Sequence, residues 1–418
     1  MRVSTGRWVS GDDFFDREPE LRLLETLARE HNHVLLTGQR RMGKTSLTRE
    51  LGRRLEAGGW AFLFADVEGA DDAEDVIARI AGASHGVRSL RSRLAGRMGR
   101  WAEENINEVS VSHFRIGLRA GLSAGSWRRH GQQLLEECAR YEQPVLLVVD
   151  ELPIFLKRML RHAEGRGRVD AFLSWLRGAL QEVEGGSLSL IVSGSIGLEP
   201  LVRRLGIPDR INHFYPVHLG PWNRETSVRC FNRLAESQGL SVAAGVAEAV
   251  YDQLGIGIPH HVQSFFARLR DFALMGGRER LTARDVPEVY QSALLGPRGQ
   301  SDLVHYETRL KDALDEEGYS IAMEILAEAS LRGAFTREAR HRLERRYAPL
   351  MDDVRERVGD ALDVLAHDGY LEPGPEGHRF GSRLLKDWWA SRFRDSRITL
   401  GSRPQDDDAR TRGGADDD

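Results

Sequence analysis

Cysteine is nearly absent from this chain, which has two, Cys138 and Cys230, among 418 residues. They lie far apart in the sequence and show no metal-ligand spacing. A disulfide framework and a cysteine-based zinc site are therefore not expected. Two buried, unreactive thiols in a reducing cytosol are the expected state.

Long apolar runs are missing as well. No stretch approaches the ~18 consecutive apolar residues that a membrane-spanning helix needs. The first twenty residues are polar and acidic, which does not match the apolar core of a secretory signal. We expect a soluble cytoplasmic protein without a membrane partner.

Neither sign of charge dominates the chain. The formal net charge is −4 and the pI is near 6.4. Contact with nucleic acid would therefore have to come from a local basic patch. The hydrophobic content of 41% is enough to build sizeable cores. The length suggests roughly two to three domains.

The strongest local signal is a glycine-rich loop between an apolar run and a helical pattern. Residues 34–36 predict a short buried strand, and leucines at helical spacing begin at Leu47. Residues 38–45 read GQRRMGKT, a full match to the P-loop pattern in the strand–loop–helix context that it requires. We predict that a nucleoside triphosphate is bound here by Gly38, Gln39, Arg40, Arg41, Met42, Gly43, Lys44, Thr45 and Ser46.

Each residue type in this loop has a physical role. Gly38 and Gly43 allow positive φ and turn backbone N–H groups toward an anion. The following helix directs the positive end of its dipole at the phosphates. Lys44 is predicted to reach the β- and γ-phosphates and Thr45 to hold Mg²⁺. The alternative, an ordinary glycine-rich turn before a helix, does not explain the complete context.

The segment just before the loop predicts a helix over residues 14–30. Arg17 lies in the charged turn at its start, and such a turn seats the adenine in many P-loop ATPases. An ordinary capped helix with Pro19 in its first turn fits the same residues. Both interpretations stay open, and Arg17 is a candidate nucleotide-binding residue.

A second strand pattern ends in two acids. Residues 144–149 are continuously apolar, as in a central parallel strand, and Asp150 and Glu151 follow. After a P-loop in the same chain, this is the Walker B pattern. Asp150 is predicted to bind Mg²⁺. Glu151 is predicted to orient and deprotonate the attacking water.

Another apolar strand, residues 188–192, ends in small hydroxyl residues. Strand carboxyl ends converge on the ligand in a doubly wound sheet. Ser193 and Ser195 are thus candidate sensors of the γ-phosphate, or caps of the next helix. Three arginines beyond are candidates for an arginine finger acting in cis or in trans: Arg203, Arg204 and Arg210, of which Arg210 is assigned the catalytic role.

The second half of the chain is predicted to be largely helical. Helical patterns cover residues 224–294, with a Gly-Pro boundary before Pro259. After a Leu-Gly-Pro-Arg-Gly linker at 295–299, three helical patterns and a turn-rich hairpin follow in the order of a winged helix. We predict a parallel α/β P-loop ATPase domain over residues 1–220, a helical lid over 221–299, a winged-helix domain over 300–395 and a disordered acidic tail over 396–418.

Two basic stretches are candidate partner surfaces. From Arg88 to Arg100 there are five arginines and no acid, which fits a solvated helix face or a surface for nucleic acid or an acidic protein. Residues 336–347 carry five arginines and two acids, but residues 336–368 carry seven and eight. DNA and protein both stay open as partners of the winged helix, as does a homo-oligomer.

The order of these features resembles the archaeal-type AAA-related ATPases, a group within the STAND class that is allied to the origin-recognition ATPases. The resemblance covers about residues 10–295, with a similar winged helix to about 394. The doubled arginine of the P-loop is its most specific part. The other matching residues are FDRE at 15–18, DELP at 150–153, SGSIG at 193–197 and GIP at 257–259.

The resemblance implies ATP as the nucleotide, an Asp-Glu catalytic pair and a helical lid that closes over the site. It adds Pro259 to the nucleotide-binding residues. A guanine-reading Asn-Lys-x-Asp motif is absent from the sequence, in agreement with ATP. Two departures are Asp16, where the family usually has glycine, and His260-His261, where related proteins often carry a sensor arginine.

The complete prediction is an Mg²⁺-dependent ATPase whose lid and winged helix move with the nucleotide state. Two alternatives stay open. One is a slow nucleotide switch that rarely turns over, and the other is a DNA-binding regulator in which ATP only sets the conformation.

Overall fold

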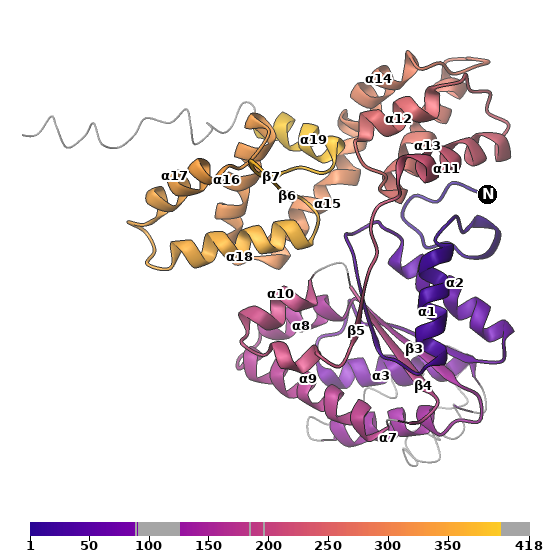
Figure 1. Ribbon diagram of the computed structural model, residues 1–418, viewed down its shortest axis with the longest axis vertical. Helices are drawn as coiled ribbons and strands as arrows, with labels where there is room; N and C mark the ends of the chain where they lie inside the picture. The colour runs from indigo at the N-terminus through magenta and orange to yellow at the C-terminus, as the bar shows by residue number, and fades with distance from the viewer. Residues whose placement is uncertain (88–89, 91–125, 184, 195–196, 394–418) are drawn as a thin grey trace, which may run out of the picture. The chain divides into compact units, whose positions relative to one another are not determined.

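The computed structural model describes residues 1–87, 90, 126–183, 185–194 and 197–393 (Figure 1). The chain divides into two compact units. The first comprises Met1–Asp252 and Ile256–Val286, and the second comprises Gln253–Gly255 and Pro287–Asp418. The predictions for Ser195, for the basic stretch from Arg88 to Arg100 and for the acidic tail lie outside the described residues.

The first unit is built on a five-stranded sheet with the order β2-β3-β4-β1-β5. All neighbouring strands in it run parallel. Parallel strands need crossover connections, which place helices on both faces of a sheet and bury its central strands completely. The strands are β1 (Val34–Thr37), β2 (Ala61–Asp66), β3 (Val145–Asp150), β4 (Leu188–Ser193) and β5 (Tyr215–His218).

The pairing register brings the carboxyl ends of the strands to one edge. Asp66 at the end of β2 is paired with Asp150 at the end of β3. Leu36 of β1 is paired with Ser193 at the end of β4. The loop after β1 therefore opens beside these polar residues, where ligands bind in sheets of this kind.

The two faces of the sheet have separate hydrophobic cores. Leu146 and Val148 of β3 pack with the first helix pair, whereas Leu147 and Val149 point to the opposite side. This alternation is the period of a β-strand. The first face is covered by α1 (Glu18–Arg29) and α2 (Lys44–Ala57), and the second by α3 (Ala73–Ala83), α7 (Trp127–Ala139), α8 (Leu152–Leu160), α9 (Gly165–Glu182) and α10 (Leu198–Arg204).

A helical segment completes the first unit. Phe231 and Phe266 pack edge to face at 5.3 Å and join two of its helices. Ile258, just before one of them, lies in the same core as Leu219 at the end of the sheet. The start of that helix is therefore fixed to the sheet domain. The helices are α11 (Arg224–Ser237), α12 (Val246–Leu254), α13 (Pro259–Met275) and the start of α14 (Asp285–Val289), which continues into the second unit, and short 3-10 turns occur at Gly11–Asp13, Ser84–Gly86 and Pro208–Ile211.

The second unit is helical with one small hairpin. Trp388 and Trp389 are fully buried in it, and the Tyr290 hydroxyl donates to Asp387 at 2.9 Å. Four helices precede the hairpin where three helical patterns were expected, and the winged-helix assignment stays a prediction. The elements are a π-helical turn (Tyr290–Leu294), α15 (Pro297–Ala313), α16 (Glu316–Arg332), α17 (Arg337–Tyr347), α18 (Val354–His367), β6 (Glu372–Gly374), β7 (Gly377–Arg379) and α19 (Arg383–Phe393).

Some predicted boundaries are wrong. The first helix begins at Glu18 instead of residue 14, because Asp16 and Arg17 adopt φ values of 62° and 71° that a helix cannot contain. The predicted linker 295–299 is partly helical, because α15 begins at Pro297 and a proline suits the first helical position. Strand β5 reads YPVH and has no apolar run to mark it.

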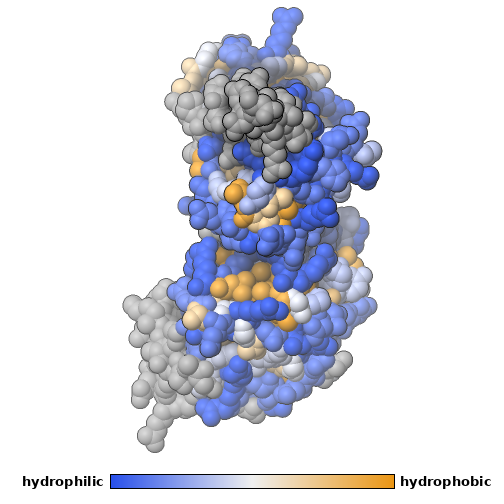
Figure 2. Space-filling model, turned by 90° about the vertical axis from the view of Figure 1, so that its left-hand side faces the viewer, coloured by the Kyte–Doolittle hydropathy of each residue, from blue (hydrophilic) through white to orange (hydrophobic). Residues whose placement is uncertain are grey.

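Hydrophilic residues cover most of the face in Figure 2, and apolar residues form only small areas on it. No described helix has both the length and the apolar character to cross a membrane.

Cys138 and Cys230 are buried as free thiols, and burial raises the pKa of each to about 12, so neither is a reactive thiolate.

Candidate active site

Three residues of the P-loop have positive backbone φ angles. Gly38 and Gly43 have φ values of 147° and 92°, in the region that favours glycine. A Cβ on Gly38 would lie 2.5 Å from the carbonyl oxygen of Leu219, so no larger residue fits there. Arg41 also has a positive φ, 70°, which is strained for a residue with a side chain.

Lys44 lies inside this loop. Its ammonium donates to the carbonyl oxygens of Gly38 at 2.6 Å and Gln39 at 3.1 Å, and its side chain is buried. Helix α2 begins at Lys44, so the unpaired N–H groups of its first turn also face the loop. A buried ammonium and a helix N-terminus together form an anion-binding site.

Asp150 joins the P-loop to strand β4. Its carboxylate accepts a hydrogen bond from Thr45 Oγ1 at 2.7 Å and from Ser193 Oγ at 2.5 Å. Burial and the adjacent charge of Glu151 raise the pKa of Asp150, although the two hydroxyl donors and Lys44 act in the opposite direction. The predicted Mg²⁺-binding pair and one predicted sensor thus lie in a single hydrogen-bonded cluster.

This cluster has the oxygen donors that Mg²⁺ takes in nucleotide sites. Mg²⁺ usually keeps several waters and binds through one or two protein oxygens plus the substrate phosphates. The Thr45 hydroxyl and the Asp150 carboxylate fit that donor set. In the part of the chain that the structure describes, no group of three or more histidines, cysteines and acids is arranged to hold a metal.

Glu151 follows Asp150 in an unusual backbone conformation. Its φ is 60°, and it is the residue from which α8 starts. Backbone strain of this kind concentrates at functional sites. The turn places Glu151 on the wall of the same cavity as Lys44 and Thr45, where a catalytic base is needed.

One cavity of about 450 Å³ collects these groups. It also contains residues that the sequence patterns missed, namely Asp66 and Glu68 after β2 and His260 and Gln263 on α13. The remaining lining residues from the loop and its surroundings are Arg40, Arg41, Gly43, Ser46, Arg49, Phe64, Asp150 and Pro259.

The N-terminal segment is the largest part of this cavity that sequence patterns missed. Ser4, Arg7, Trp8 and Val9 all line it. The backbone N–H of Val9 donates to Ser46 Oγ at 3.0 Å, and that of Ser4 donates to Gln263 Oε1 at 3.1 Å. Residues 4–9 are positioned by such single hydrogen bonds to distant residues. They therefore show no periodicity or motif in the sequence.

Arg17, Met42 and Arg210 were predicted as site residues and do not line this cavity. Arg17 is buried beside the P-loop and does not line the cavity, and its Nη2 donates to the carbonyl oxygens of Gly220 at 2.7 Å and Met42 at 3.4 Å. The Met42 side chain lies in the hydrophobic core. Arg210, the assigned arginine finger, is ion-paired with Asp170 at 2.7 Å and is also outside this cavity.

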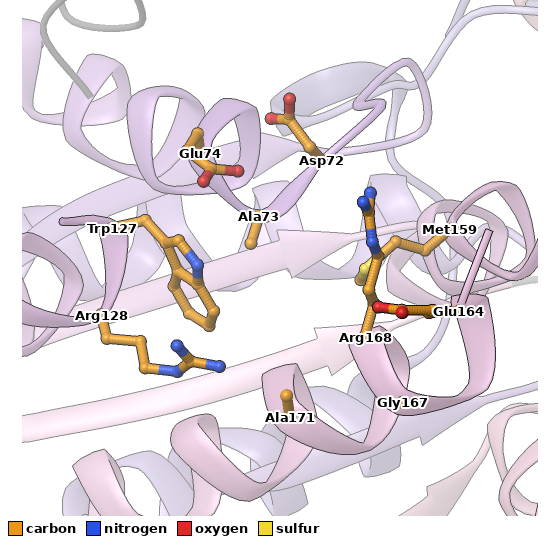
Figure 3. A pocket seen from close by; sticks show the side chains of 10 residues that line it. All are labelled: Asp72, Ala73, Glu74, Trp127, Arg128, Met159, Glu164, Gly167, Arg168 and Ala171. Carbon is orange, nitrogen blue, oxygen red and sulfur yellow. The ribbon is translucent and has the colours of Figure 1, made fainter. Parts of the chain in front are cut away.

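A second cavity, of about 470 Å³, lies among the helices on the other face of the sheet (Figure 3). Trp127 and Arg128 line one side of it, Asp72 and Glu74 come from the start of α3, and Arg168 faces them from α9. The Arg128 guanidinium lies over the Trp127 ring at 4.7 Å. Because none of the P-loop or Walker B residues lines this cavity, the nucleotide is assigned to the first one.

Comparison with known proteins agrees with this geometry. Residues 13–160 match the family model of the AAA ATPase domain. The matched stretch contains the P-loop, Asp150 and Glu151. This part of the chain is an AAA ATPase domain. The matched part of this ATPase ends in α8, and the sheet pairing joins β4 and β5 to the same domain.

Among the solved structures with a similar fold, two align with most of this chain. A Walker-type ATPase of Pyrococcus abyssi is 18% identical with a TM-score of 0.57, over 93% of this chain and 99% of that one. The Aeropyrum pernix ORC2 protein in its ADPNP-ADP complexes is 14% identical with a TM-score of 0.56, over 91% and 95% of the two chains. No curated protein matches the sequence of the ATPase.

Proposed function

We propose that this chain is an Mg²⁺-dependent ATPase that couples hydrolysis to a movement of its helical segments. The observation that carries the proposal is the pair of hydrogen bonds that Asp150 accepts from Thr45 and Ser193, because they join the P-loop residue to the Walker B acid. A loop that bound an anion for structural reasons alone would not need this acid or the strained Glu151 beside it.

The residues then have distinct roles in hydrolysis. When ATP binds, the Lys44 ammonium exchanges its hydrogen bonds to the loop carbonyl oxygens for hydrogen bonds to the β- and γ-phosphate oxygens. Thr45 and Asp150 hold Mg²⁺, which when bound neutralises charge on those phosphates. Glu151 accepts a hydrogen bond from the attacking water and takes its proton as the water oxygen bonds to the γ-phosphorus and the bond from that phosphorus to the β,γ-bridging oxygen breaks, so that ADP leaves with the bridging oxygen. Ser193 keeps Asp150 oriented.

Coupling to the helical segments is proposed to begin at α13. Pro259 and His260, in the first turn of α13, line the nucleotide cavity. A change at the γ-phosphate therefore reaches this helix directly. In this proposal residues 221–299 act as a lid and residues 300–395 as a winged helix. The narrower assignment to the STAND class is part of the same proposal.

Arg210 supports an arrangement in which an arginine finger acts between copies of the chain. Its guanidinium pairs with Asp170 and with Asp209 at 2.6 Å, outside the cavity of its own chain. A catalytic role would thus require a neighbouring copy that presents Arg210 to this site. We propose a homo-oligomer as the hydrolytically active form.

Helix α17 is proposed as the contact surface for an acidic partner. It carries five arginines and two glutamates. Arg340 is held by Glu344 at 2.8 Å in the i,i+4 arrangement. DNA is the partner we favour, because its phosphates are anionic. Its binding through such a patch weakens steeply with salt, so the interaction is simple to test.

Two buried free thiols suit a reducing compartment such as the cytoplasm.

Steady-state ATP hydrolysis tests the proposal. Wild type should hydrolyse ATP only with Mg²⁺ present, and Lys44→Ala should abolish the activity. Lys311→Ala removes an exposed ammonium in the second unit and serves as the matched control. Wild-type turnover retained in Lys44→Ala would contradict the assignment. Repeating the assay with duplex DNA at two salt concentrations tests the partner.

A further inference from the structure

We propose that Arg41 is the residue that distinguishes ATP from ADP in this site and that His260 positions it. The inference rests on the proposed function of the cavity. Arg41 Nη1 and His260 Nδ1 lie 2.9 Å apart, although 219 positions separate them in the chain. Both residues line the nucleotide cavity together with Lys44 and Glu151.

The chemistry of the pair fixes the state of the histidine. A guanidinium has N–H donors only, so His260 Nδ1 must accept the hydrogen bond. The ring is therefore neutral and carries its proton on Nε2. This state suits its place in the second position of α13, where the positive end of the helix dipole disfavours a charged imidazolium.

The backbone of Arg41 supports a functional role. Its left-handed φ of 70° costs conformational energy that a side chain without a task would not require. The side chain of this loop residue reaches His260 in the first turn of α13. The contact therefore holds the guanidinium in one orientation at the cavity wall.

The two cations of the site have different surroundings. Lys44 is buried at the base of the loop, between the carbonyl oxygens of Gly38 and Gln39. Arg41 is only half-buried and lies against α13 at the cavity wall. A planar guanidinium recognises phosphate oxygens in a bidentate way and adds most where a further phosphate is present. Arg41 therefore contacts the γ-phosphate, and its bond to His260 links that phosphate to α13.

Nucleotide affinities of the full-length protein test this assignment. Dissociation constants for a non-hydrolysable ATP analogue and for ADP would be measured with wild type, Arg41→Ala, His260→Leu, His260→Asn and the double variant Arg41→Ala/His260→Leu. Arg41→Ala should lower the preference for the ATP analogue over ADP about tenfold to a hundredfold, the loss expected for a hydrogen bond to a charged group.

The histidine variants separate positioning from packing. His260→Leu should reduce the same preference, and His260→Asn should restore much of it, because the asparagine oxygen can accept near the position of Nδ1. The double variant should be no worse than Arg41→Ala alone, because the two residues act through one contact. Gln263→Ala, one turn further along α13, should change both affinities by the same factor.

Two results would overturn the inference. An unchanged preference for the ATP analogue in Arg41→Ala would exclude Arg41 as the discriminating residue. Additive losses in the double variant would exclude positioning by His260. Both results leave the proposed function intact as long as wild type binds and hydrolyses ATP, whereas failure of wild type to bind ATP would overturn the proposed function itself.

Discussion

The hydroxyl of Thr45 donates a hydrogen bond of 2.7 Å to the carboxylate of Asp150, across 105 positions of the sequence. Thr45 lies in the first turn of α2, after the P-loop, and Asp150 ends the strand of the Walker B pattern. The contact brings together the two oxygen donors that are proposed to hold Mg²⁺. Ser193 holds the same carboxylate from the neighbouring strand, so three elements determine its orientation.

Replacing Ser193 tests this support of Asp150. Ser193→Ala removes one of the two hydroxyl donors to the carboxylate, and a partner of a metal ligand typically contributes about tenfold to a hundredfold to metal affinity or activity. We expect ATP hydrolysis to require correspondingly more Mg²⁺, measured as the half-saturating Mg²⁺ concentration. Ser189→Ala, on the same strand and bonded to the Asn32 carbonyl, should leave that concentration unchanged.

Glu151→Gln separates binding from hydrolysis. The amide keeps the size of the side chain but cannot take the proton of the attacking water. A general base contributes about 10²- to 10⁴-fold, so turnover should fall by that factor while ATP binding persists. Single-turnover hydrolysis and equilibrium binding would be measured on the same preparation. Turnover close to that of wild type would mean that another group serves as the base.

Arg17→Ala should reduce stability more than catalysis. The guanidinium donates to the carbonyl oxygens of Gly220 and Met42, and a buried acceptor left without a donor costs about 1–3 kcal/mol. The measurement is the free energy of unfolding from denaturant titration. Arg22→Ala, an exposed arginine on the same helix, provides the control. A specific loss of ATP affinity at unchanged stability would instead support the predicted adenine contact.

Acid should destabilise the protein through His33. Burial lowers the pKa of His33 to about 4, from 6.5 when unfolded, and the nearby His213 behaves in the same way. The neutral ring stabilises the fold fully above pH 6.5, and this contribution is lost as the pH falls from 6.5 toward 4. For His33 this contribution to the free energy of unfolding is at most roughly 3 kcal/mol, because solvent screening reduces it.

A pH series of unfolding free energies checks this expectation. His33→Asn should flatten the slope between pH 6.5 and 4, because the titrating group is gone. His341→Asn, in an exposed position of the second unit, should leave the slope as it is. A wild-type curve without any decline in this range would show that the buried histidines do not control acid stability.

The sequence predicted the parts of the site that depend on local patterns. Strands β1, β3 and β4 are buried on both faces, so each appears as an apolar run, and the P-loop glycines follow from backbone geometry. The contacts of Arg17 with the carbonyl oxygens of Gly220 and Met42 could not be predicted from the sequence, because they are set by tertiary packing. The same holds for the contact of Arg41 with His260, which no local spacing reveals.

The N-terminal segment is expected to slow nucleotide release. The Arg49 guanidinium lies between the rings of Trp8 and Phe64, at 4.1 Å and 3.9 Å from their centroids, and all three residues line the cavity. Trp8→Ala removes one side of this stack, a cation–π contact whose loss at a half-exposed position should raise the dissociation rate about two- to fivefold.

Stopped-flow release of a fluorescent ATP analogue measures that rate. Trp8→Phe keeps an aromatic face over Arg49 and should stay close to wild type. Leu23→Ala, which removes another exposed apolar side chain of the same unit, controls for a general effect of surface truncation. If Trp8→Ala and wild type released the analogue equally fast, the segment would not close the site. The cavity would then be bounded by the P-loop, the acids and α13 alone.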